Sequence, residues 1–167
     1  MRQVGKYLGM LASLVVLLAL SAPVALAGNP HWIKSATFDS ISGSSLVATF
    51  KEAGLPSGAT ETITLSAHVA ITYECVNGGG HNPSASNKTA FQETSSVSGN
   101  FSADRNGNIV GSLTLTAPSA ASLGFSCPPG QTVTFVSVYY TQVSLADEDT
   151  GISIALADQS AVNPSAP

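Results

Sequence analysis

The chain has three histidines, and they are its strongest candidates for metal binding or acid–base chemistry. They are His31, His68 and His81. An amino-terminal copper site needs histidine third with amides before it, whereas His31 is fourth after the expected cleavage site and Pro30 has no N–H. His68 shares its parity with threonines and serines, which is typical of an outward sheet position. A metal-binding enzyme using these histidines is one alternative.

Other catalytic signatures are missing from the sequence. No Gly-x-Ser-x-Gly elbow follows residue 27, so no activated serine is indicated. Asp104 to Asn108 resembles the start of a calcium loop, but Ile109 and Leu115 stand where glycine and glutamate are required. We therefore expect a non-catalytic protein with no cofactor and no metal.

One acidic turn is a candidate binding site for calcium. Asp147, Glu148 and Asp149 place three carboxylates in succession, which together with backbone oxygens suit Ca²⁺. Such runs are more often solvated turns, and the sequence does not decide between the two.

A glycine-, asparagine- and serine-rich loop over 76–87 is the main candidate for ligand binding, because it is longer than a hairpin requires. The segment 117–130 should meet it at the same end of the fold. Asn77, His81, Asn82 and Phe125 would then share one binding surface. The competing interpretation is that both segments are plain connections.

Residues 1–27 carry the pattern of a cleaved signal peptide. Arg2 and Lys6 form the positive region, an apolar stretch follows, and Ala25-Leu26-Ala27 is the small-x-small motif of a signal peptidase site. We expect a mature protein that begins at Gly28 and is not inserted in a membrane. It would be secreted, or retained at the cell surface.

The charge of the mature chain limits its partners. Loss of Arg2 and Lys6 moves the formal net charge from −4 to about −6. So few cations cannot neutralise a run of phosphates, which argues against nucleic acid as a partner.

Cys75 and Cys127 are the chain's two cysteines. In an exported protein this even count predicts a disulfide, and only one pairing is possible. Closing a loop of this length should stabilise the fold by roughly 4 kcal/mol.

Alternating apolar and polar residues predict strands throughout the mature chain. The clearest run is 62–75, where Ile63, Leu65 and every second residue after them share one parity. Further strands are expected over 32–39, 46–50, 89–103, 109–115, 132–146 and 152–156. About seven strands at this spacing favour an all-β, immunoglobulin-like Greek-key sandwich over 28–160, followed by a flexible tail over 161–167.

Several short sequence segments resemble those of known protein families. Gly28-Asn29-Pro30-His31-Trp32, Glu74-Cys75-Val76-Asn77-Gly78-Gly79 and Cys127-Pro128-Pro129-Gly130-Gln131 resemble uncharacterised small secreted bacterial proteins of the actinobacterial type. Glu52-Ala53-Gly54-Leu55 and Ser102-Ala103-Asp104-Arg105-Asn106-Gly107 are more loosely similar to the apoproteins that carry enediyne chromophores. Both resemblances imply an Ig-like β-sandwich and no particular ligand.

The sequence thus favours a non-catalytic extracellular module that binds an unknown ligand or surface component. The alternative is a structural protein that associates with itself through edge strands, because those edges carry few charges. Either a monomer or weak self-association is compatible with the pattern.

Overall fold

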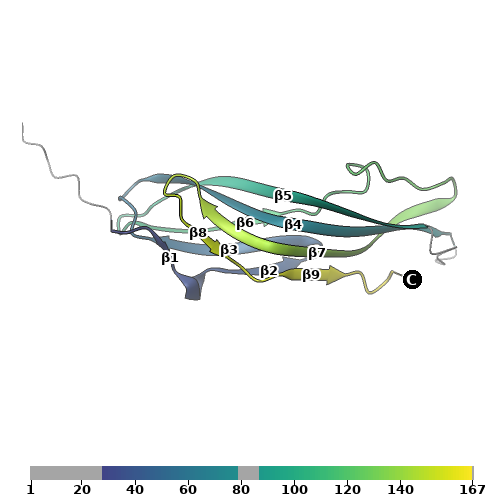
Figure 1. The fold of residues 1–167 in the computed structure, drawn as a ribbon, viewed down its shortest axis with the longest axis horizontal. Coiled ribbons are helices and arrows are strands. Elements are labelled where there is room, and N and C mark those ends of the chain that lie inside the picture. The colour runs from purple at the N-terminus through teal and green to yellow at the C-terminus, as the bar shows by residue number, and fades with distance from the viewer. Residues whose placement is uncertain (1–27, 79–86, 167) are drawn as a thin grey trace, which may run out of the picture.

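The computed structural model describes residues 28–78 and 87–166. This part of the chain folds into antiparallel strands and one short 3₁₀ turn, η1 (Lys34–Ala36), with no α-helix (Figure 1). The all-β prediction is confirmed. The strands are β1 (His31–Trp32), β2 (Phe38–Ser42), β3 (Ser45–Ala53), β4 (Thr60–Asn77), β5 (Lys88–Ser102), β6 (Asn108–Leu115), β7 (Gln131–Asp147), β8 (Ser153–Ala155) and β9 (Gln159–Val162).

The strands form two sheets that enclose one core (Figure 1). In the first, here called the short sheet, β3 pairs with β6 on one side and with both β1 and β2 on the other. In the second, the long sheet, the order is β5-β4-β7, and β8 and β9 both pair with β7. Leu46, Phe50, Ile63, Leu65, Tyr140 and Leu145 are among the fully buried side chains between the sheets.

The prediction of one strand over 32–39 is wrong, because η1 divides it into β1 and β2. The Thr37 hydroxyl donates to the carbonyl of Ile33 at 3.0 Å, and the Thr37 amide donates to Lys34 O at 3.4 Å. These local bonds favour a turn over continued pairing. Both strand pieces still pair with the same edge of β3.

The edge of the long sheet is divided at a bulge in β7. Ser66 pairs with Ser144 but His68 pairs with Thr141, so β7 carries an extra residue there, and Gln142 has a φ of 54°. The carboxylate of Asp158 accepts a hydrogen bond from the Gln142 amide at 3.0 Å. The chain that follows β7 therefore pairs with it in two pieces. β8 pairs with β7 on the C-terminal side of the bulge, and β9 pairs with it on the N-terminal side.

β9 extends regular pairing to Val162, two residues beyond the predicted end of the sandwich at residue 160. The Asn163 side-chain amide donates to Phe135 O at 2.9 Å and fastens the chain beyond the strand.

The predicted disulfide between Cys75 and Cys127 is confirmed, with 5.6 Å between their Cα atoms. It joins the end of β4 to the green connection that runs from β6 to β7 at one end of the elongated molecule (Figure 1). The described residues include no helix long and apolar enough to cross a membrane.

Candidate functional site

The loop surface predicted from the sequence lies only partly within the described residues. Asn77 is the last residue of β4 and pairs with Gln131 of β7. His81 and Asn82 lie outside the described residues. Asn77 and Phe125 are therefore the two members of that prediction whose surroundings can be stated.

Phe125 packs against the long sheet. Its ring lies 6.3 Å from the ring of Tyr73 and 6.0 Å from that of Phe91, measured between centroids. The Tyr73 hydroxyl donates to Pro118 O at 2.6 Å, which holds the same connection against β4. The half-buried Phe125 ring thus covers the core at the disulfide end.

His31 and His68 lie on different sheets. His31 is exposed on β1, and its Nδ1 lies 2.8 Å from Asn29 O. His68 lies in the middle of β4, half-buried on the outer face, with Thr94 and Thr141 as its cross-strand neighbours. The described residues therefore give these two histidines no common metal site.

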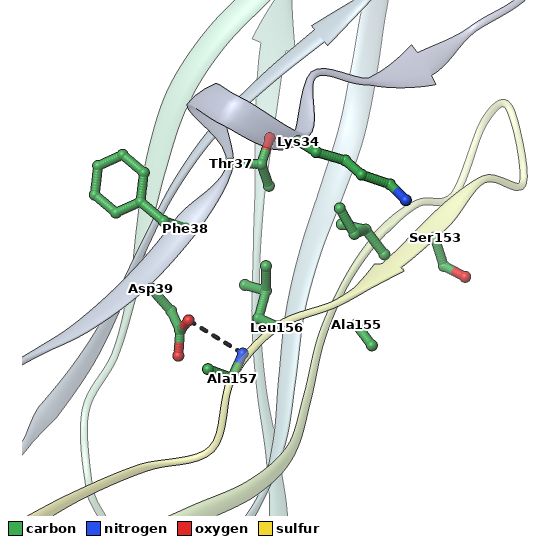
Figure 2. A pocket seen from close by; sticks show the side chains of 9 residues that line it. Lys34, Thr37, Phe38, Asp39, Ser153, Ala155, Leu156 and Ala157 are labelled. Carbon is green, nitrogen blue, oxygen red and sulfur yellow. Dashed lines mark hydrogen bonds between the residues drawn. The ribbon is translucent and has the colours of Figure 1, made fainter.

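A groove lies on the open side of the sandwich, between the edges of the two sheets. One wall is formed by η1 and β2, and the other by β8 and the residues after it (Figure 2). Its volume is about 650 Å³. The lining residues are Lys34, Thr37, Phe38, Asp39, Ser153, Ile154, Ala155, Leu156 and Ala157.

Both walls of this groove are strand edges with pairing on one side only. β2 pairs with β3, and β8 pairs with β7, while the described residues contain no strand between β2 and β8. Phe38 stands at this edge with 55% of its surface exposed, which is high for so large an apolar side chain.

Polar groups at the ends of the groove are few and defined. Asp39 Oδ1 accepts a hydrogen bond from the Ala157 amide at 3.2 Å, which bridges the two walls (Figure 2). Asp39 Oδ2 is buried with no donor among the described residues. The Lys34 side chain extends across the other end toward β8 (Figure 2). The groove therefore has an apolar middle between a cation and an anion.

A second hollow of about 270 Å³ continues the groove toward β1. It shares Lys34, Ser153 and Ile154 with the first and adds Trp32 and Ile152, together with Pro30 and His31. The two hollows together are called the seam groove below.

A cluster of carboxyl groups lies in the interior near the end of the seam groove that reaches β1. Glu52 of β3 and Asp147 of β7 are almost fully buried, and so is Glu61 of β4. Burial, followed by the adjoining carboxyl of Asp147 and the charge of Glu61, raises the pKa of Glu52 from 4.5 to about 8. Burial and the charges of Asp147 and Asp149 also raise the pKa of Glu61.

Sequence reasoning missed Glu52 and Glu61. The signal was present, because each shares the parity of its strand's core residues: Glu52 with Phe50, and Glu61 with Ile63. A charged residue on the inward face of a strand is unusual and points to a paired or functional group.

Comparisons with protein-family models, with curated proteins and with solved structures give no match to this chain.

Proposed function

We propose that the protein is a non-catalytic, secreted β-sandwich of the Ig-like Greek-key type that binds an extended polypeptide segment in the seam groove. The strand order supports the fold assignment. Sheets ordered β2-β3-β6 and β5-β4-β7-β8 match the A-B-E and C′-C-F-G arrangement of Ig-like domains. The leader-like residues 1–27 and the disulfide support export.

The observation that carries the ligand proposal is the pair of free strand edges that flank an apolar groove. A free edge offers backbone N–H and C=O groups to an incoming chain, and such pairing gives affinity irrespective of sequence. Phe38 and Leu156 would then contact alternate side chains of the segment. With Lys34 at one end and Asp39 at the other, the groove also favours one direction of the segment.

Peptide selection tests this proposal directly. The chain would be expressed with its own leader, purified from the medium and used to select binders from a random peptide library. We expect the selected peptides to lose at least about tenfold in affinity for a Phe38→Ser variant, as for an anchor residue of an interface.

The matched control is Val110→Ser, because Val110 is 71% exposed on β6, at the opposite edge of the short sheet. Its peptide affinity should equal that of the wild type. Recovery of no peptide, or of peptides that bind the Phe38→Ser variant as well as the wild type, would contradict the proposal.

Self-association is a second candidate, favoured by the other edge of the long sheet. β5 is 15 residues long, and among the described strands it pairs with β4 alone. Lys88 and Glu93 are its only charged residues. Long edges with few charges are prone to pair with another chain.

Light scattering across a range of concentrations separates the two candidates. Pairing through β5 predicts a mass that rises with concentration and returns to that of a monomer in the Ser96→Lys/Ser98→Lys variant. A mass that stays monomeric in the wild type would contradict self-association.

A further inference from the structure

Three carboxyl groups of the long sheet meet at the end of the sandwich opposite the disulfide, and a fourth, that of Glu52 on the short sheet, adjoins them. Carboxylate oxygens of Glu61, Asp147 and Asp149 all lie within 4.8 Å of one another. These residues belong to the start of β4, the end of β7 and the turn that follows β7. Glu52 lies on β3 of the short sheet with a fully buried side chain, and interaction with the Asp147 carboxyl is among the causes that raise its pKa.

Glu52 is the most informative member of the cluster. Its side chain is 0% exposed, and no N–H or O–H group among the described residues donates to either of its oxygens. A hydrogen bond with Asp147 is therefore possible only when one of the two carries a proton. A buried carboxylate with no donor is costly, so this one requires a proton or a cation.

The two aspartates of the cluster are held in place and keep free acceptor positions. Asp147 Oδ1 accepts from the amides of Asp149 and Thr150 at 2.9 and 3.2 Å, and its Oδ2 accepts from the Thr150 hydroxyl at 2.7 Å. Asp149 Oδ2 accepts from the Thr62 amide at 2.7 Å. Because an ionised carboxylate has about four acceptor positions, both aspartates retain capacity for a further ligand.

Protein cations do not neutralise this cluster. Within 28–78 and 87–166, no lysine, arginine or histidine lies within ion-pair distance of its members. The ion pair found there is Lys88–Glu74, at 3.0 Å, near the disulfide end of the long sheet. The negative charge in the interior is therefore left to a proton or a cation from solution.

We propose that these four carboxyl groups bind one Ca²⁺ ion that joins the two sheets. An all-oxygen set favours a hard cation over zinc or copper, which take nitrogen and sulfur ligands. Ca²⁺ accepts six to eight oxygens in irregular geometry, so backbone carbonyls and water would complete its shell. Mg²⁺ demands a near-regular octahedron, which ligands from three strands and a turn are less suited to provide.

Bound Ca²⁺ would act as a second clamp on the fold. Glu52 belongs to the short sheet and its three partners to the long sheet, so the ion holds the sheets together as the core does elsewhere. The calcium site would exist whether or not the seam groove binds a peptide. It adjoins the seam groove, since Ile152 lines that groove and its carbonyl accepts from the Asp147 amide at 2.9 Å.

Terbium luminescence provides a direct test on the secreted protein. Trp32 is the chain's one tryptophan, and it pairs with Glu52 across β1 and β3. Tb³⁺ bound in the cluster should therefore emit when the indole is excited, and Ca²⁺ should displace it. We expect a Ca²⁺ dissociation constant of about 0.1–1 mM, as in extracellular calcium modules.

Thermal unfolding gives a second readout. After treatment with a chelator, addition of roughly 10 mM Ca²⁺ should raise Tm by several degrees, and Mg²⁺ should raise it less. Glu52→Gln and the exposed-site variant Asp149→Asn should each weaken Ca²⁺ binding by at least about tenfold. Glu148→Gln is the matched control, because Glu148 lies in the same turn, exposed and outside the cluster.

Two experimental results would overturn the proposal. One is the absence of both Tb³⁺ emission and a Tm shift with Ca²⁺. Another is an equal loss of affinity in Glu148→Gln and Asp149→Asn, which would indicate diffuse attraction to an acidic turn. Asp149→Asn keeps the test interpretable if Glu52→Gln folds poorly, because Asp149 is exposed.

Discussion

The two ends of the sandwich are closed in different ways. At one end, a disulfide ties β4 to the connection before β7, and Phe125 and Tyr73 pack beneath it. At the other end, Glu52 and Asp147 face each other across the gap between the sheets. The first end is held mainly by a covalent bond and apolar contacts, and its charged residues Lys88 and Glu74 neutralise each other in an ion pair.

The acidic end behaves differently, because its closure depends on what neutralises its charge. Buried carboxylates that face one another repel when ionised, and a proton or a cation relieves that repulsion. The comparison therefore teaches that a change of pH or of Ca²⁺ concentration acts chiefly on the acidic end.

Removal of the disulfide should have the largest effect. The Cys75→Ala/Cys127→Ala variant loses a crosslink between residues 52 positions apart, and its free energy of unfolding should fall by roughly 4 kcal/mol. Urea unfolding measures this loss, which should be equal with and without Ca²⁺. A loss that Ca²⁺ restores would show that the two ends are coupled.

The pH dependence of the acidic end should come next. The pKa of Glu52 is raised from 4.5 to about 8, so the folded state binds a proton that the unfolded state has released. The contribution of Glu52 to the free energy of unfolding of the metal-free protein is therefore fully present below about pH 4.5, and is lost as pH rises through about 8. The slope is at most about 1.4 kcal/mol per pH unit for this group.

Urea unfolding with a chelator present, at several pH values, checks this decline. Glu52→Gln should flatten it, since the amide does not titrate. Glu61 contributes in the same direction, because its pKa is also raised. Stability that increases over this interval would contradict the buried placement of Glu52.

Truncation of the aromatic cover at the disulfide end should have a moderate effect. Phe125→Ala removes contacts with Tyr73 and Phe91, and we expect a loss of about 2 kcal/mol, below the range for a fully buried phenylalanine. Denaturant unfolding measures it, with the bulk of the loss independent of pH. A loss below about 0.5 kcal/mol would mean that the ring does not contribute to the core.

The smallest change in the free energy of unfolding is expected from a substitution in the middle of the sandwich, between the two ends. The buried Tyr140 hydroxyl donates to Ser44 O at 2.7 Å and so links the long sheet to the turn between β2 and β3. Tyr140→Phe should cost about 1 kcal/mol by leaving this carbonyl without its donor, whatever the pH or Ca²⁺ concentration. Tyr139→Phe, at an exposed position of the same strand, is the control and should change little.

Much of the fold was predictable because its signals are local. The alternation from Ile63 to Cys75 predicted strand β4, and the two cysteines allowed one pairing. The division of the strand predicted over 32–39 was not visible, since the hydroxyl of Thr37 competes with sheet pairing through bonds that hydropathy does not record.

The sites were less predictable. Phe125 lies in a segment without periodicity, so nothing in its neighbours indicated that the ring would turn inward onto Tyr73. Asp147 and Asp149 were recognised as a calcium candidate, but Glu52 and Glu61 were not joined to them. The seam groove had no signal at all, because it depends on where the edges of two sheets stop.

The amino-acid sequence by itself determined the strands, the inward or outward direction of their side chains, the disulfide pairing and the acidic character of the chain. These properties follow from the two-residue period of a strand and from composition. Only the tertiary structure decided which inward residues meet. Glu52 and Asp147 are distant in the chain, and strand register together with the stacking of the sheets places their carboxyl groups side by side.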